Sequence, residues 1–224
     1  MNDTWLVGGA VSWTTGDGSF SNGSSDMGGW SAAAYLSGFF ENGAYVDVVG
    51  RTGRLSTDIS ASSGSSVFTA HYANTTLGAS VEAGWRQNLS KSVFVEPQAE
   101  FVYGFVQGDA FTGANGVSVD QNDFETLVGR LGVRVGKTFA HHVGSVYAHA
   151  SWNREFRGEA DYTARLGDVV RREGVDLGGS WLSMGVGGQL NHSMHLALYG
   201  SLERSGGSDY DEDYRYTVGV RCTD

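Results

Sequence analysis

Apolar and polar side chains alternate along residues 92–107. Phe101 is one of the apolar residues at the odd-numbered positions, whereas Glu96, Gln98 and Glu100 fill even-numbered positions between them. Because successive side chains of a β-strand point to opposite faces, this pattern predicts a strand with one apolar face and one charged face. Such a strand suits a soluble sheet whose apolar face lies on a core, or a membrane barrel with lipid outside and water inside.

The same alternation recurs in about ten segments of strand length, which favours an all-β fold. The segments span residues 4–14, 28–40, 44–57, 75–88, 92–107, 125–139, 143–156, 180–191, 194–204 and 213–223. The connections between them alternate between short (41–43, 88–91, 140–142, 191–193) and longer (15–27, 58–74, 108–124, 157–179, 205–212). An even number of strands, with short turns at one end and long loops at the other, predicts an antiparallel transmembrane β-barrel.

The two faces of the predicted strands differ in chemistry. The polar face carries both signs of charge and many glycines, as expected for a narrow lumen whose strands curve tightly. We predict these pore-lining residues: Asp47, Arg51, Glu82, Arg86, Glu96, Gln98, Glu100, Arg130 and Arg134. We predict these lipid-facing residues: Val81, Val95, Phe101, Leu131, Val133, Val186, Leu196 and Leu198. Antiparallel pairing of residues 92–107 with 125–139 should form ion pairs between their inward carboxylates and arginines.

Aromatic residues fall mainly near the ends of the predicted strands. They are Trp13, Trp30, Phe39, Phe40, Trp85, Tyr103, Phe105, Trp152, Phe156, Trp181, Tyr214 and Tyr216. In membrane barrels, aromatic girdles occupy these levels, where lipid meets water. A second interpretation, that they are ordinary core aromatics of a soluble fold, stays open on this pattern alone.

Composition narrows the class of protein. The chain has 224 residues with one Pro and 34 Gly, and the glycines are spread through the apolar segments, which indicates a single domain of many short strands. A formal charge of −10 has the wrong sign for a nucleic-acid-binding surface. The lone Cys222 cannot form an internal disulfide, and no run of apolar residues is long enough for a transmembrane helix. Residues 1–9 lack the basic and apolar segments of a secretory signal, so an exported protein would need a signal upstream.

The sequence offers no convincing catalytic, metal or cofactor site. The acidic run 209–214 opens like a calcium loop, but Tyr214 stands where Gly is needed and Val220 where Glu belongs, so we interpret it as a loop tip. Two pairs of histidines, His141 with His142 and His192 with His195, fall at predicted turns without suitably spaced ligands. We find no nucleophile elbow, phosphate loop or dinucleotide motif, and therefore predict a protein that is not an enzyme and has no cofactor.

Several segments resemble the C-terminal translocator barrel of the classical autotransporters. The most specific part is the Glu-Ala-Gly motif followed by Glu-Pro-Gln-Ala within residues 82–99, and the similar segments are 28–55, 76–104, 130–139, 146–156 and 214–224. The resemblance implies a twelve-stranded barrel of type V secretion in the outer membrane of a Gram-negative bacterium. It also implies three partners: outer-membrane lipid, the barrel assembly machinery and an N-terminal passenger, which a helix through the pore links to the barrel.

The chain departs from the family pattern at both ends. Residues 1–224 would begin at the family's third strand, so we expect an N-terminally truncated translocator domain without passenger, pore helix or first two strands. Family members typically end in an aromatic residue, which the assembly machinery reads together with the preceding strand. The corresponding assembly-signal strand here comprises Tyr214, Tyr216, Val218, Val220, Cys222 and Asp224. A passive diffusion pore and a soluble ligand-binding β-barrel are the alternative functions.

Overall fold

An antiparallel sheet of 11 strands dominates the computed structural model, which describes residues 4–64, 66–139, 143–191, 196–207 and 210–222. The long strands pair in chain order, and the short β5 pairs only with β6. The strands are β1 (Thr4–Phe20), β2 (Gly23–Phe39), β3 (Ala44–Ser63), β4 (Ser66–Trp85), β5 (Gln87–Asn88), β6 (Val93–Val106), β9 (Phe124–Thr138), β10 (Gly144–Glu155), β13 (Gly179–Asn191), β14 (Leu196–Gly207) and β15 (Asp211–Cys222).

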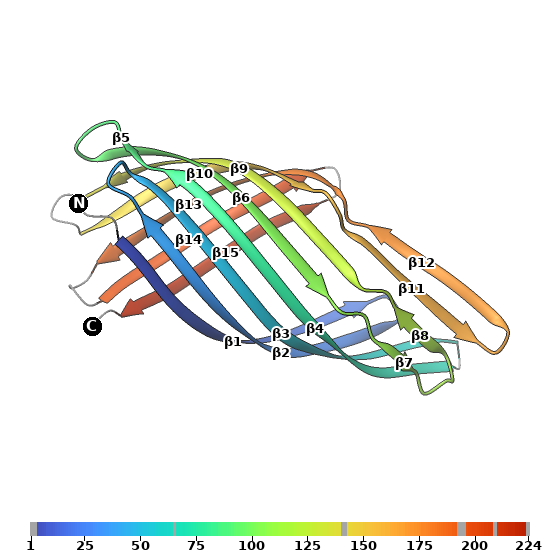
Figure 1. The fold of residues 1–224 in the computed structure, drawn as a ribbon. Helices are drawn as coiled ribbons and strands as arrows, with labels where there is room; N and C mark the ends of the chain where they lie inside the picture. The colour runs from blue at the N-terminus through green and yellow to red at the C-terminus, as the bar shows by residue number, and fades with distance from the viewer. Residues whose placement is uncertain (1–3, 65, 140–142, 192–195, 208–209, 223–224) are drawn as a thin grey trace.

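The sheet curls strongly, so that it has a concave and a convex face (Figure 1). In the part of the chain that the structure describes, β1 pairs only with β2 and β15 only with β14, so these two strands are the edges of the sheet. The antiparallel pairing that we predicted is confirmed, whereas a closed ring of strands is not seen. Among the described residues there is no helix with the length and apolar character needed to cross a membrane.

A second sheet of 4 strands lies at one end of the curled sheet, in the order β12-β11-β8-β7. Its strands are β7 (Ala110–Thr112), β8 (Ser118–Gln121), β11 (Glu159–Leu166) and β12 (Val169–Asp176). The β11–β12 hairpin projects beyond the main sheet (Figure 1). Residues 108–124 and 157–179, which we had interpreted as loops, therefore contain paired strands.

The first two hairpins are longer than predicted. Strand β1 continues to Phe20 and β2 already begins at Gly23, so the expected loop 15–27 is mostly ladder. Strands β3 and β4 likewise pair as far as Ser63 and Ser66. The prediction was wrong here because it used apolar alternation, which marks only the part of a strand that has an apolar face, whereas ladder hydrogen bonds form between strands of any composition. The predicted turn 140–142, and most of 191–193, lie outside the described residues.

Pro97 explains an interruption in the sheet. The ladder between β4 and β6 runs to Gly84 opposite Gln98, and β5 resumes the pairing at Gln87 opposite Val95. Pro97 lies at this break and pairs on its other side with Val133 of β9. Because proline has no backbone N–H to donate, it can sit in an inner strand only where a neighbouring ladder is interrupted.

The apolar side of the sheet is its exposed side. Phe94 and Ala197, with 2% and 6% exposure, are the only buried hydrophobic side chains among the described residues, whereas Phe101 is 60% and Leu131 59% exposed. The buried side chains are mainly polar and include Glu96, with 4% exposure. A soluble barrel would bury its apolar face as a core, so the structure contradicts that alternative.

Candidate functional site

A row of acidic and basic side chains crosses the concave face at one level of the sheet. Asp47 of β3 is opposite Glu82 of β4, Glu82 is opposite Glu100 of β6, and Glu100 is opposite Arg130 of β9. Arg130 Nη2 lies 2.8 Å from Glu100 Oε2 and also pairs with Glu82 Oε2. One guanidinium therefore holds two carboxylates from neighbouring strands, which limits the repulsion between them.

A second row of charges crosses the same face closer to the short turns. Glu96 of β6 is opposite Arg134 of β9, and their Oε1 and Nη1 atoms are 3.0 Å apart. Farther along the row, His149 Nε2 of β10 lies 2.8 Å from Glu203 Oε2 of β14. The intervening strand β13 has Gly185 at this level, and a Cβ there would lie 2.6 Å from His149 Cε1. His149 reaches Glu203 because Gly185 leaves the path across β13 open.

Tyr45 connects the two rows. Its hydroxyl donates to Glu82 Oε1 at 2.7 Å and accepts from Gln98 Nε2 at 2.6 Å. Gln98 Nε2 also lies 3.0 Å from Glu96 Oε1, to which it donates. The concave wall formed by β3, β4, β6 and β9 therefore carries a continuous polar network. Such a network is stable in a partly buried place when most of its polar groups have partners, and here the Arg134 Nε atom is the exception among the described members of the network.

The structure brings the predicted polar residues together on one face. The expected ion pairs form, Glu96 with Arg134 and Glu100 with Arg130. Arg86 lies beyond the end of β4 and stacks on the Phe94 ring. The sequence interpretation missed other members of this face: Tyr45, His149, Asn153, Ser183, Glu203, Ser205 and Arg215. The same two-residue period could have identified all of them except Ser205, which falls in the predicted connection 205–212, since each of the others occupies the inward position of its predicted strand.

The predicted apolar set lies on the opposite face. Val81, Phe101, Leu131, Val133, Val186 and Leu198 are exposed, and Val95 and Leu196 are half-buried. In the predicted assembly-signal strand, Tyr214, Tyr216, Val218 and Val220 are all exposed. The backbone of Cys222 pairs with Leu196, and Asp224 lies outside the described residues.

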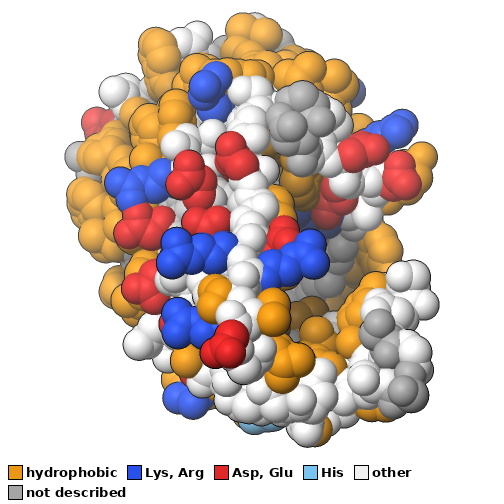
Figure 2. Space-filling model, turned by 90° about the vertical axis from the view of Figure 1, so that its right-hand side faces the viewer, with side chains coloured by type: hydrophobic (Ala, Val, Ile, Leu, Met, Phe, Trp, Pro, Cys, Tyr) orange, Lys and Arg blue, Asp and Glu red, His pale blue; other side chains and the backbone are white. Residues whose placement is uncertain are grey.

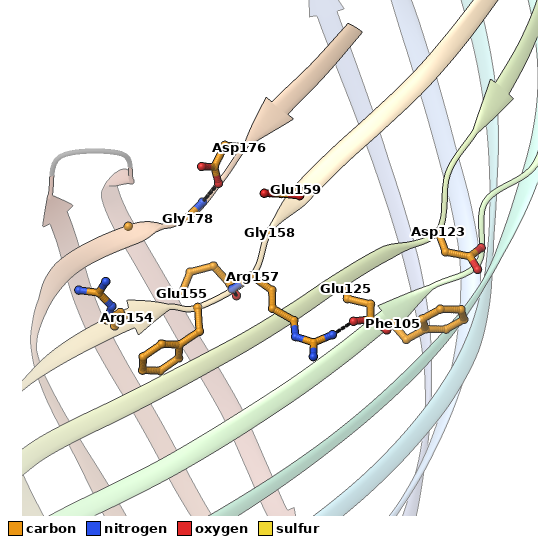
Figure 3. Close-up of a pocket in the computed structure, with 12 residues that line it drawn as sticks. Phe105, Asp123, Glu125, Arg154, Glu155, Arg157, Gly158, Glu159, Asp176 and Gly178 are labelled. Carbon is orange, nitrogen blue, oxygen red and sulfur yellow. Dashed lines mark hydrogen bonds and ion pairs between the residues drawn. The ribbon is translucent and has the colours of Figure 1, made fainter. Parts of the chain in front are cut away.

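A different cluster fastens the base of the β11–β12 hairpin to β9. The Glu155 carboxylate, 9% exposed, accepts hydrogen bonds from the backbone N–H of Leu127 at 2.7 Å and of Arg157 at 3.0 Å, and from the Thr126 hydroxyl. Arg157 and Glu125 point toward one another and form an ion pair (Figure 3). Glu125, Glu155 and Arg157 are among the residues that line a pocket of about 730 Å³. The carboxylate satisfies backbone donors at the place where the chain leaves the main sheet.

Charged side chains also gather at the hairpin end of the molecule. Figure 2 looks onto this end and shows acidic and basic side chains over its centre, with hydrophobic side chains mostly toward its margins. In the connection before β15, burial and the neighbouring Glu212 carboxylate raise the pKa of Tyr210 above its usual value. The central charges and marginal hydrophobic side chains in Figure 2 match a polar interior surrounded by an apolar outer surface.

No cluster suited to a metal ion is found among the described residues. The histidines His141, His142, His192 and His195 lie outside them, as does Asp209 of the acidic run. These predictions therefore stay untested.

Comparison with known proteins identifies the family. Residues 1–203 match the family described as the autotransporter beta-domain. The chain belongs to this family. The pertactin autotransporter of Bordetella bronchiseptica is 31% identical to this autotransporter β-domain over 226 residues, which cover 97% of the chain and 24% of pertactin. The serine protease Sat autotransporter of Escherichia coli is 30% identical over 197 residues, which cover 85% of the chain and 15% of Sat. The chain thus spans only a minor part of these relatives.

Solved structures agree with this assignment. The β-domain of the Bordetella autotransporter BrkA is 25% identical and superposes with a TM-score of 0.82, covering 99% of this autotransporter β-domain and 84% of that chain. The translocator domain of NalP from Neisseria meningitidis gives a TM-score of 0.78 at 15% identity, covering 97% of this chain and 75% of that one. The second likeness concerns the fold alone.

Proposed function

We propose that this autotransporter β-domain is the outer-membrane translocator of a Gram-negative type V secretion protein and enables an N-terminal passenger to reach the cell surface. The structural observation that carries the proposal is the distribution of polarity: the apolar face is exposed, and the charged face is concave and paired across strands. A conduit for polypeptide through lipid needs this distribution. The domain is a transport structure, and we assign it no catalytic residue, metal or cofactor.

The convex face is the surface in contact with lipid. Phe101, Leu131 and Val186 are each more than half exposed, and their strands carry further apolar residues on the same side. Soluble monomers rarely expose a continuous apolar surface of this kind, because contact with water is unfavourable. We assign this role to the predicted set Val81, Val95, Phe101, Leu131, Val133, Val186, Leu196 and Leu198.

The concave face lines the pore. Its charges of both signs are paired across β4, β6 and β9, which keeps the wall hydrated without a large net field. We assign the role of pore lining to Asp47, Arg51, Glu82, Arg86, Glu96, Gln98, Glu100, Arg130 and Arg134. A chain in transit would meet water and polar side chains on this wall.

Strands β1 and β15 must acquire partners before the domain can span a membrane. Each has one unpaired edge in the described part of the chain, and unpaired backbone groups in hydrocarbon cost several kcal/mol each. We propose that residues 1–224 act within a larger translocator whose further strands close the ring. The barrel assembly machinery would insert it, using the strand that contains Tyr216 and Val218.

Surface display of a tagged passenger tests the proposal. The full-length protein, with an epitope in its passenger, is expressed in a Gram-negative host, and intact cells are treated with proteinase K. We expect loss of the epitope from intact cells, and heat-modifiable migration of the protease-protected barrel in detergent. A barrel that folds in the outer membrane and conducts ions while its passenger stays periplasmic would support the diffusion pore instead. A β-domain that stays soluble without amphiphile would contradict both membrane functions.

A further inference from the structure

A cavity on the concave face, near the short turns, is lined by three arginines. It has a volume of about 580 Å³, and Arg86, Arg134 and Arg221 reach it from the two sides of the curled sheet. Hydroxyl and amide groups complete the polar lining: Ser145, Tyr147, Gln189, Tyr199 and Ser201. No carboxylate is among the described residues that line the cavity. In a chain of net charge −10, this is a local concentration of positive charge.

Arg86 is held in place without an acidic partner among the described residues. Its guanidinium lies 3.6 Å from the centre of the Phe94 ring, and its Nη2 donates to Thr138 Oγ1 at 3.0 Å. Phe94 is itself 2% exposed, so the ring is a fixed platform. A guanidinium that stacks on an aromatic ring keeps edge N–H groups available for a ligand. Arg86 is therefore oriented before any ligand arrives.

The other two arginines, Arg134 and Arg221, add to the positive charge of the cavity. The side chain of Arg221 has no ion-pair or hydrogen-bond partner among the residues that the structure describes. It projects from the same face of β15 as Arg215. Arg134 pairs with Glu96 through Nη1 and lies over the Tyr147 ring at 4.8 Å, but its buried Nε has no partner among the described residues. Among the described residues, two of the three guanidinium groups, those of Arg86 and Arg221, thus have no carboxylate partner, and Arg134 has one unused donor.

We propose that this cavity binds a carboxylate of the polypeptide segment that occupies or crosses the pore. The inference rests on the proposed function, because it assumes that polypeptide passes this wall. Guanidinium groups match carboxylates in charge and geometry, and binding in a partly enclosed cavity strengthens the interaction relative to open water. The exposed aromatic ring of Tyr199 offers apolar surface for the methylene groups of an acidic side chain. The cavity would therefore select acidic positions of that segment.

Peptide binding to the folded full chain in detergent micelles tests this inference. Hexaglutamate is titrated at low ionic strength and followed by calorimetry, with hexalysine and inorganic phosphate as the other probes. We expect hexaglutamate to bind, and the combined change of Arg86→Gln and Arg221→Gln to weaken it about tenfold or more. The matched control combines Arg165→Gln with Arg172→Gln on the exposed hairpin, which removes the same charge, and we expect it to change the affinity less than about twofold.

The possible outcomes are distinct. Equal weakening in the two double variants, or hexalysine binding as tightly as hexaglutamate, would overturn the proposal. Phosphate binding at the affinity of hexaglutamate would assign the cavity to free anions instead of polypeptide, which also overturns it. If the double variant does not fold, Arg221→Gln alone is decisive, because this exposed side chain has no described partner to lose. A domain that displays its passenger but does not bind hexaglutamate would refute this inference and leave the translocator function intact.

Discussion

Removing the Glu155 carboxylate should release the base of the β11–β12 hairpin from β9. In Glu155→Ala, the backbone N–H groups of Leu127 and Arg157 and the Thr126 hydroxyl all lose their acceptor. Neighbouring backbone bonds, such as Phe156 N–H to the Leu127 carbonyl at 2.9 Å, stay in place. We therefore expect local opening at the junction while the main sheet keeps its fold.

The size of the effect follows from the kind of hydrogen bond that is lost. A hydrogen bond to a charged acceptor contributes about 1.5–3 kcal/mol, and the Glu155 carboxylate is buried, so water replaces it poorly. Since about 1.4 kcal/mol corresponds to a factor of ten, the Leu127 amide should lose about 10-fold to 150-fold of its protection against hydrogen exchange. Glu155→Gln, which keeps one acceptor oxygen, should fall between the wild type and Glu155→Ala.

Hydrogen–deuterium exchange of the folded protein in detergent measures this directly. The amides of Leu127 and Arg157 report the junction, and the amide of Leu131, farther along β9, reports the main sheet. Glu125→Gln is the matched control, because it removes a carboxylate whose ion pair with Arg157 is exposed and contributes about 0–1 kcal/mol. If Leu127 and Arg157 exchange in Glu155→Ala within about twofold of the wild type, the proposed anchoring is refuted.

Two further substitutions test the assigned faces and the packing across the concave wall. Val133→Arg on the convex face should lower the stability in lipid vesicles by about 2–4 kcal/mol, and Gln98→Arg on the concave face much less; equal losses in urea unfolding would contradict the lipid-facing assignment. Gly185→Ala should destabilise by about 1–3 kcal/mol, because its Cβ would lie 2.6 Å from His149 Cε1 and 2.7 Å from a backbone carbonyl oxygen. Gly50→Ala, where a Cβ meets nothing within 4 Å, should be neutral, and equal effects of the two changes would rule out the His149 contact as the cause.

The faces of the strands could be predicted from the sequence because they depend on a local rule. A period of two residues assigns each side chain to a face, and strands that follow one another in the chain are expected to pair in an antiparallel barrel. The meeting of Glu96 and Glu100 with Arg134 and Arg130 on one face follows from these two facts. Pro97 could also be interpreted from a local rule: proline has no backbone N–H to donate, so a strand that contains it needs an interrupted ladder at that position.

Features that depend on distant segments could not be predicted. The 4-stranded sheet joins β8 to β11, whose sequences show no common pattern, and the position of Glu155 matters only because β10 ends beside Leu127 of β9. The extensions of β1 and β3 beyond the apolar pattern were missed for another reason. Their side chains there are mostly small and polar, so they form ladder hydrogen bonds without any apolar alternation to reveal them.

The inner wall gains its cohesion from polar contacts that reach beyond neighbouring strands. With few buried apolar side chains, the concave face cannot rely on a hydrophobic core, so ladder hydrogen bonds and side-chain pairs must hold the strands in register. The contact of His149 with Glu203 spans two strand spacings, which is possible because Gly185 lies between them. The glycines on the inner face therefore do more than permit curvature. They decide which charged side chains can meet, and alternation along a single strand contains no information about that choice.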